Sequence, residues 1–360
     1  MKLMPDDRRM VGDFEIVDFA SDARVEEIRD QLKVPYTSEV SWQWNYCSEV
    51  GDLRSLYEKG KDGQWNAMTD IDWSLPVDRE SDFASGDGLV LPTVCRLLGK
   101  NEATIREAIW DEINWILSQL LHGEQAALQL CGQLTNMAET TDEKWYAASQ
   151  VVDEARHIEV FAHFLNEKMG KIYPISPSLK ILLDELLVAE TYHMKTLGMQ
   201  TLFEGMAVGI MDGLREGTSN EIFYDVIRRV QGDEARHAAF GVLTMRRCVE
   251  RCSEAERSHL EDWAFAVLEG LNANQQLDML RAIGPKYEIE PDKLITMIHG
   301  LDNWAETNAT GFMHTVIPNL QRLGLITEQT EAGWRSCGML IDNRSETNGR
   351  AFTLPPSPAA

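Results

Sequence analysis

The sequence has few cysteines, a shortage of basic residues and no long apolar run. Its 360 residues include 6 cysteines, whose wide spacing forms no disulfide framework, and this agrees with a reducing compartment. Lys and Arg number 34 against 58 Asp and Glu, and the net charge of −24 argues against nucleic acid as a partner. No apolar stretch reaches the length of a membrane span, and the first residues do not form a signal peptide. We therefore expect a cytoplasmic protein that binds neither nucleic acid nor membrane.

Strong helix breakers are also scarce in the middle of the chain. Residues 101–250 are expected to be helical almost throughout, with spans at about 102–138, 143–169, 178–215 and 219–250. The break between the second and third spans carries Gly170, Pro174 and Pro177, which favours a long crossover connection in a four-helix bundle. The chain is thus expected to be all-α, with an N-terminal arm at 1–100 that packs on the bundle, the bundle itself at 101–250, further helices at 251–345 and a flexible tail at 346–360.

Five residues, Asp-Glu-Ala-Arg-His, occur twice, beginning at Asp153 and at Asp233. A further glutamate stands 30 residues before the glutamate of each copy, and the whole unit repeats after 80 residues. The regularity indicates two related helix pairs that carry the same polar groups. The paired glutamates are Glu124 with Glu154, and Glu204 with Glu234.

The spacing inside each motif places its glutamate and its histidine on one helix face. Residues three apart in a helix are neighbours, roughly 5–6 Å between Cβ atoms. Glu154 and His157 can therefore face one metal ion, and so can Glu234 and His237. Neither pair fills a coordination sphere alone, so each needs ligands from neighbouring helices.

The residues midway between each upstream glutamate and its motif are typical of turns and helix N-caps. They are Thr140-Thr141-Asp142 in the first unit and Gly217-Thr218-Ser219-Asn220 in the second. An antiparallel hairpin that turns there returns the upstream glutamate to the level of its motif, about 22 Å from the turn. Glu124 and Glu204 then complete a set of four glutamates and two histidines, which is the ligand set of a carboxylate-bridged di-metal site in a four-helix bundle.

Two alternatives compete with parts of this interpretation. The motifs could lie on solvated, salt-bridged helix faces, but apolar neighbours such as Phe161 and Phe240 favour burial. Glu190 competes with Glu204 in the same expected helix; the two are 14 residues apart, about 21 Å along the axis, and cannot serve one site. The 30-residue repeat selects Glu204. Glu190 and His193 are then either satisfied polar groups near the helix start or residues that line a channel.

The donor set indicates the metal and its supporting residues. Carboxylate-rich ligation with one histidine per ion suits iron or manganese, whereas zinc sites take more nitrogen or sulfur donors. We expect two iron ions, because Fe(II) can reduce dioxygen, with manganese as the alternative. A ligating histidine normally gives its other N–H to a carboxylate. We therefore expect Asp153 to pair with His237 and Asp233 with His157, while the motif arginines offset negative charge.

With Glu124, Glu204 and the two Asp-Glu-Ala-Arg-His motifs in this spacing, the sequence resembles the ferritin-like non-haem di-iron superfamily, in particular its oxidase and oxygenase branch. The resemblance covers about residues 105–250. It implies a ferritin-like four-helix bundle and an enzyme that activates dioxygen to oxidise a small organic substrate. It also implies an electron donor, either a reductase or a ferredoxin, and a homodimer. A ferroxidase or peroxidase without an organic substrate is the alternative.

Two positions near the motifs keep the reaction subtype open. Phe161 lies one turn after His157, where the small subunits of ribonucleotide reductase carry a radical tyrosine. Val208 lies one turn after Glu204, where the multicomponent hydroxylases carry a threonine. Hydroxylation, N-oxygenation and desaturation all stay open. The residues expected to line a substrate pocket are Gln125, Ala127, Leu128, Cys131, Phe161, Gln200, Thr201, Val208 and Phe240.

Overall fold

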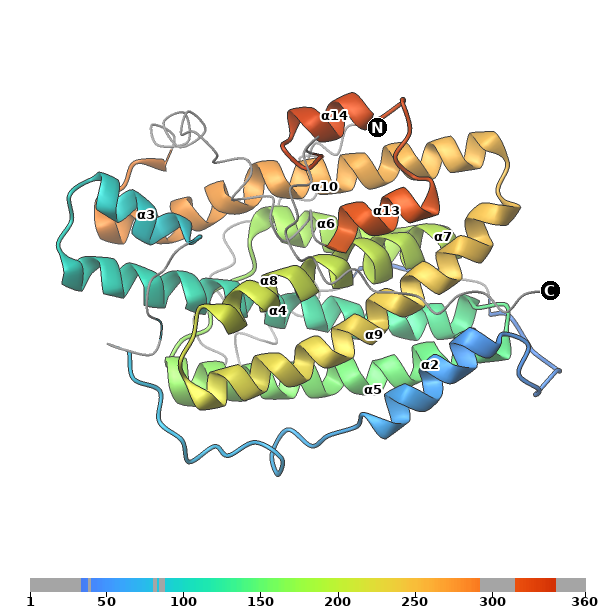
Figure 1. Cartoon of the computed structure of the whole chain (residues 1–360), viewed down its shortest axis with the longest axis horizontal. Coiled ribbons are helices and arrows are strands. Elements are labelled where there is room, and N and C mark those ends of the chain that lie inside the picture. The colour runs from blue at the N-terminus through green and yellow to red at the C-terminus, as the bar shows by residue number, and fades with distance from the viewer. Residues whose placement is uncertain (1–33, 38–39, 80–82, 84–87, 292–314, 341–360) are drawn as a thin grey trace.

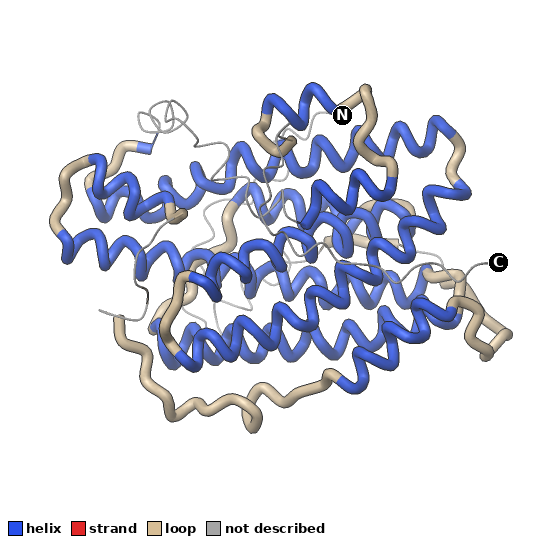
Figure 2. Tube along the Cα trace, in the orientation of Figure 1, coloured by secondary structure: helices blue, strands red, loops and turns tan. Residues whose placement is uncertain are grey.

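The computed structural model describes residues 34–37, 40–79, 83, 88–291 and 315–340. Within these residues the chain is helical, as expected, and has no strand beyond an isolated β-bridge between Phe83 and Thr218. Figure 2 shows the helices stacked side by side and joined by short loops, with longer loops along the N-terminal arm. None of the helices in this part of the chain is long and apolar enough to cross a bilayer. The tail expected at 346–360 lies outside the described residues.

Four helical rods form the bundle that the sequence predicts (Figure 1). α4 (Glu102–Met137) and α5 (Thr141–Phe164) make the first hairpin. α8 (Glu204–Glu216) and α9 (Glu221–Arg251) make the second. Contacts between α4 and α5 and between α8 and α9 hold each hairpin together, and α5 against α9 joins the two. The architecture is therefore a four-helix bundle with additional helices around it.

Both hairpins turn at the polar residues that the sequence singles out. The Thr140 side chain accepts a hydrogen bond from the backbone N–H of Glu143, whose carboxylate binds back to Thr140 in a capping box. The Asn220 side chain accepts from the backbone N–H of Phe223 in the same way. These caps satisfy N–H groups that a helix start leaves free, so they fix where α5 and α9 begin.

The third rod is not one helix over 178–215, and that prediction was wrong. The chain forms α6 (Pro177–Val188), breaks, and starts again at α7 (Tyr192–Lys195). It continues through η3 (Thr196–Phe203), a π-helical segment, directly into α8. Glu190 therefore lies in the break, and its side chain is exposed.

Two polar interactions produce this break. Thr191 caps the new helix because its side chain accepts a hydrogen bond from the backbone N–H of Met194. The buried Lys195 ammonium donates to the last carbonyls of α6, at 3.0 Å from Leu186 O and 2.9 Å from Leu187 O. A cation that binds the C-terminal carbonyls of a helix stabilises its end. The pattern of apolar residues favours helix through this point. The hydrogen bonds of the Thr191 and Lys195 side chains nevertheless end α6 and start α7.

The crossover between α5 and α6 is held against α4. A short π-helical segment, η2 (Leu165–Met169), ends at Gly170, whose φ of 74° is left-handed and favours glycine. Beyond it, the backbone N–H of Tyr173 donates to Ser118 Oγ at 3.0 Å, and that of Ser176 donates to Gln119 Oε1 at 2.7 Å. The predicted breakers therefore mark a connection that is fixed by hydrogen bonds to the first bundle helix.

Further helices cover the bundle on several sides. α2 packs on α5 and α9, α3 packs on α4, and α10 packs on α6 (Figure 1). Residues of α13 and α14 join the apolar cluster under α10. These helices span Gly51–Asp62 (α2), Val90–Leu97 (α3), Glu254–Ile283 (α10), Ile317–Leu323 (α13) and Glu331–Ser336 (α14).

Only part of the N-terminal arm packs as expected. The arm was expected to pack on the bundle, but its residues Trp42, Trp44 and Tyr46 are 74%, 76% and 72% exposed. Packing is closer at α2 and beyond it, where Trp65 and Trp73 lie against the apolar core. The part of the arm that matters for the centre of the bundle is therefore α2 and the loop after it.

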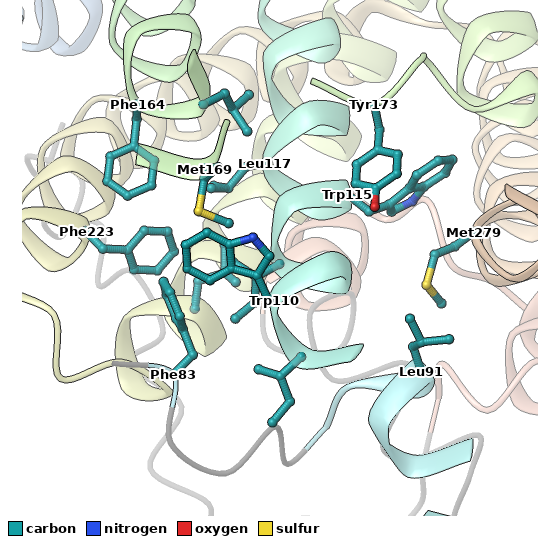
Figure 3. Packing of buried hydrophobic residues seen from close by; sticks show 14 of the residues in the cluster. Phe83, Leu91, Trp110, Trp115, Leu117, Phe164, Met169, Tyr173, Phe223 and Met279 are labelled. Carbon is teal, nitrogen blue, oxygen red and sulfur yellow. The ribbon is translucent and has the colours of Figure 1, made fainter. Parts of the chain in front are cut away.

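An aromatic cluster closes one end of the bundle, and Figure 3 shows Phe83, Trp110, Phe164 and Phe223 packed together there. The ring centroids of Phe83 and Phe223 are 5.1 Å apart and nearly perpendicular, and those of Phe164 and Phe223 are 5.5 Å apart. The first pair is edge-to-face and the second is tilted, and such aromatic contacts add to the free energy gained from burial. Phe223 is thus a shared contact of α5, α9 and the loop that contains Phe83.

We predict that Phe223→Ala lowers the free energy of unfolding by roughly 3–5 kcal/mol, because it leaves a cavity between three packed rings. Denaturant unfolding followed by circular dichroism measures the change. Tyr224→Ala on the same helix is the matched control: its side chain is 43% exposed, and it should change stability by only about 0.5 kcal/mol. Equal losses in the two variants would contradict the role of Phe223.

Candidate metal centre

The structure brings together the six residues that the sequence selects. Each rod contributes at the same level: α4 gives Glu124, α5 gives Glu154 and His157, α8 gives Glu204, and α9 gives Glu234 and His237. All six side chains are buried, with at most 5% exposed. Within the described residues they form two overlapping groups whose ligand atoms all lie within 4.8 Å of one another. The groups are Glu124, Glu154, His157 and Glu234, and Glu154, Glu204, Glu234 and His237.

Both imidazoles present the same nitrogen to the carboxylates. His157 Nδ1 lies 2.8 Å from Glu234 Oε1, 3.3 Å from Glu124 Oε2 and 3.4 Å from Glu154 Oε2. His237 Nδ1 lies 2.9 Å from Glu234 Oε2 and 3.3 Å from Glu154 Oε1. Glu154 and Glu234 therefore stand between the two histidines, while Glu124 and Glu204 approach from the other helices.

Burial and mutual repulsion make this arrangement unfavourable for the carboxylates alone. Burial raises the pKa values of the Glu124 and Glu204 carboxyl groups well above their usual range, and the negative charge of Glu234 raises both pKa values further. Burial by itself would lower the pKa of His157, but the charges of Glu234 and Glu124 outweigh it and raise that pKa. The centre thus favours any species that adds positive charge between the carboxylates.

The donor atoms also fit a metal ion. Glu154 Oε2 and Glu234 Oε1 are buried and accept no hydrogen bond from the described part of the chain. Glu234 Oε1 is nevertheless only 2.8 Å from His157 Nδ1. Both atoms are metal-binding donors, and a cation held between them would replace the proton that the raised pKa of His157 otherwise favours. Oxygen-rich donors with one imidazole on each side suit iron or manganese.

Behind the histidines lie the two aspartates of the motifs, in the crosswise contacts that the sequence predicts. His157 Nε2 is 3.1 Å from Asp233 Oδ2, and His237 Nε2 is 3.3 Å from Asp153 Oδ2. Although burial alone would raise their pKa values, the hydrogen bonds from the histidines lower the pKa of both aspartates. Each aspartate therefore accepts from Nε2–H and leaves Nδ1 free to face the glutamates.

The motif arginines join the aspartates into one network. Arg156 Nη2 donates to Asp153 Oδ1 at 2.6 Å and to Asp233 Oδ2 at 2.9 Å. Arg236 forms an ion pair with Asp233. Both aspartates are almost fully buried, so these guanidinium groups neutralise charge that water cannot reach. The arginines thus act as the sequence leads us to expect.

Two residues of the N-terminal arm complete this network, and sequence reasoning missed both. Gln64 Nε2 donates to Asp153 Oδ1 at 2.7 Å, and its Oε1 accepts from Arg156. Trp65 Nε1 donates to Asp233 Oδ2 at 2.8 Å, and the Arg156 guanidinium lies 4.8 Å from its ring centroid. The arm therefore contacts both aspartates: Gln64 binds Asp153, and Trp65 binds Asp233. The only sequence signal is that an amide and an indole follow α2 directly.

A third residue absent from the predictions, Gln150, contacts two of the glutamates directly. Its Nε2 donates to Glu154 Oε1 at 2.8 Å and to Glu204 Oε1 at 3.0 Å. Gln150 stands four residues before Glu154, on the same helix face, which is the signal that could have identified it. Nearby, Gln200 Nε2 donates to Cys131 Sγ at 3.4 Å.

Most residues expected to line a pocket are buried near the centre, with Gln125 as an exception. Gln125 is exposed, so its predicted place in the pocket was wrong, because that position faces outward from α4. Gln200 and Thr201 are fully buried in η3, which precedes Glu204. π-Helical turns are rare and frequently occur at functional sites. A Cβ atom at Gly241 of α9 would lie 2.7 Å from the Gln200 backbone, so η3 and α9 approach closely there.

Comparison with known proteins gives a fold but no close relative. No family model and no curated protein matches the sequence. Among solved structures, the dimanganese(II) NrdF of Streptococcus sanguinis matches with a TM-score of 0.51 and 13% identity, over 83% of this chain and 99% of that chain. An R2-like ligand-binding oxidase with a Mn/Fe cofactor matches with a TM-score of 0.47 and 18% identity, over 76% of this chain and 92% of that chain. The chain therefore has a ferritin-like helical fold, as the S. sanguinis structure does, with a carboxylate–histidine cluster inside the bundle.

Proposed function

We propose that the six clustered residues hold two metal ions and that the protein is a di-iron enzyme that uses dioxygen to oxidise a small organic substrate. The observation that carries the proposal is the overlap of the two ligand groups, which share Glu154 and Glu234. Those two residues would bridge the ions, Glu124 and His157 would complete one side, and Glu204 and His237 the other. Manganese is the alternative metal, and the S. sanguinis NrdF is an example of this fold with dimanganese(II).

The residues around the ligands would orient them and keep water away. Two such ions, when bound, supply the redox chemistry and open coordination positions that dioxygen reduction needs. Asp153 and Asp233 hold the Nε2–H of the two histidines, which keeps each Nδ1 directed at the glutamates. Phe161 and Phe240 are fully buried and limit the access of bulk water to the centre. Because Phe161 is not a tyrosine, a radical-generating subunit is disfavoured and oxidation of a substrate is preferred.

We infer that electrons enter from the side of the N-terminal arm. Trp65, Asp233 and His157 form a continuous chain of hydrogen bonds from a half-buried indole to the centre. An external donor, a reductase or a ferredoxin, would dock near Trp65. The acidic balance of the chain favours a basic surface on such a partner. We further propose a homodimer in the cytoplasm, as the sequence suggests.

Loss of a shared ligand should remove the metal ions. Glu154→Ala and Glu234→Ala should each reduce the content from two ions per chain to less than one, because both ions lose a bridging donor. Anaerobic loading with Fe(II), desalting and elemental analysis measure the content. Asp153→Asn should keep two ions but weaken their affinity about 10–100-fold, since the imidazole loses its orienting partner.

The exposed Glu190 supplies the control for these variants. Glu190→Ala should retain both ions, because its side chain lies in the break before α7 and away from the cluster. Loss of an ion in Glu190→Ala, or retention of both in Glu154→Ala and Glu234→Ala, would contradict the ligand assignment.

Oxygen consumption tests the reaction itself. The Fe(II)-loaded protein should consume dioxygen repeatedly when supplied with a reductant and an oxidisable small molecule, and the oxidised product should appear in proportion to the oxygen used. Glu154→Ala should show neither. Consumption that is independent of every added substrate, with ferric iron accumulating beyond two ions per chain, would instead identify a ferroxidase.

A further inference from the structure

Three buried hydroxyl groups near the centre differ from the other hydroxyl groups in the bundle. A serine or threonine inside a helix commonly donates to the carbonyl one turn earlier. Ser118 Oγ does so to Asn114 O at 2.7 Å, and Thr135 Oγ1 does so to Cys131 O at 2.9 Å. The hydroxyls of Thr196, Thr201 and Thr244 make no such bond to the backbone, although all three residues are fully buried.

Thr196 belongs to a row of buried polar groups that leads to Glu204. Tyr192, Thr196 and Gln200 precede Glu204 at steps of four residues, so neighbours in the row lie on one face of α7 and η3. Tyr192 OH and Thr196 Oγ1 lie close enough to hydrogen-bond to each other. Beyond that contact, neither they nor the buried Gln200 Oε1 have a hydrogen-bond partner among the described residues. The row starts near the exposed Thr191 and ends at the metal centre.

Helices α5 and α9 contribute further buried polar groups near Glu204 and Gln200. At the centre, Gln150 of α5 is bonded to Glu204, but its Oε1 is buried and without a partner in the described chain. Gly241 of α9 packs against the Gln200 backbone. Thr244, whose hydroxyl has no hydrogen-bond partner in the described chain, follows one turn later on α9. We name Gln150, Tyr192, Thr196, Gln200 and Thr244 the polar column.

The outer end of the polar column lies near the buried Glu143 and the partly exposed Arg247. The Tyr192 phenol is close enough to Glu143 and Arg247 for both charges to influence its pKa, which burial raises. Arg247 Nη1 lies 4.0 Å from Glu143 Oε1, and the Arg247 side chain is 32% exposed. The column therefore extends through the ends of α5, α7 and α9 from solvent to Glu204.

Leaving these buried polar atoms without hydrogen bonds would cost free energy at each residue of the polar column, because each group has lost its hydrogen bonds to bulk water. Water is the partner that such groups take when each site offers two or more polar contacts. An apolar substrate would satisfy none of these atoms. The spacing of one polar residue per helical turn also fits single water molecules better than a bulky ligand.

We propose that the polar column holds a chain of ordered water molecules that carries protons between solvent at Arg247 and the Glu204 side of the metal centre. The role rests on the proposed function, since oxidation of a C–H substrate by dioxygen to an alcohol and water consumes two electrons and two protons. The external reductase or ferredoxin supplies the electrons near Trp65, and the column supplies the protons from solvent. Electrons would thus reach the centre through Asp233 and His157, and protons through the residues that precede Glu204.

The double variant Thr196→Val, Thr244→Val tests the column in the metal-free protein. Magnetic relaxation dispersion of water oxygen counts long-lived internal water molecules, and the variant should lose at least one. Thr135→Val is the matched control, because it makes the same change at a hydroxyl that is already bonded to the backbone. Equal water counts in wild type, double variant and control would overturn the proposal. If the double variant does not fold, Thr196→Val is compared with Thr196→Ser, which keeps the hydroxyl and should keep the water.

The proton role has a separate readout. In Fe(II)-loaded protein, the double variant should slow dioxygen-dependent oxidation about tenfold without changing the metal count, and Thr196→Ser should retain the wild-type rate. An unchanged rate in a variant that has lost water would overturn proton transfer through the column. Failure of wild-type protein to bind metal would instead refute the proposed function, while the water count in the metal-free protein would still decide whether the column is hydrated.

Discussion

The burial of four glutamates at one level of a helix bundle is the constraint on which the rest of this structure depends. Removing a carboxylate from water is costly unless opposite charge and hydrogen bonds accompany it. Here the compensation comes from His157, His237 and the arginine–aspartate network behind them. Each helix must reach this level in the correct register, which explains why polar caps fix the starts of α5 and α9.

The two sides of the centre have different structures. On the side of α5 and α9 the histidines contact a dense network of ions, which the arm closes with an amide on Asp153 and an indole on Asp233. The Glu204 carboxylate of α8 contacts the amide of Gln150 from α5 and follows a π-helical segment whose buried hydroxyls do not bond to the backbone. The first side suits rigid orientation and electron transfer, and the second suits exchange of water and protons. This difference breaks the near-symmetry of the repeated motifs.

The bundle and the ligand cluster could be predicted because they depend on local rules that the sequence repeats. A glutamate and a histidine three residues apart, a cap midway along each hairpin and a glutamate 30 residues upstream together determine one level for all six side chains. The fold that these rules imply is the one observed, including the crossover after Gly170.

The errors and omissions mostly involve side-chain contacts that the helix pattern does not encode, whereas the missed Gln150 stands four residues before Glu154. The break before α7 depends on Lys195 binding the carbonyls of another helix, while the local pattern still favours helix. Gln64 and Trp65 lie 89 and 168 residues from the aspartates that they contact, so no spacing could assign them. The arm was expected to pack on the bundle, yet its residues Trp42 and Trp44 stack on each other at the surface with ring centroids 5.4 Å apart.

The most direct test of the metal centre is a crystal structure of protein loaded anaerobically with Fe(II), or with Mn(II), in which anomalous scattering is recorded at the edge of the metal used. Two anomalous peaks should appear inside the bundle, one bounded by Glu124 and His157 and the other by Glu204 and His237, with Glu154 and Glu234 contacting both. A single peak, peaks at other residues, or no peak at full metal loading would contradict a di-metal centre at these residues.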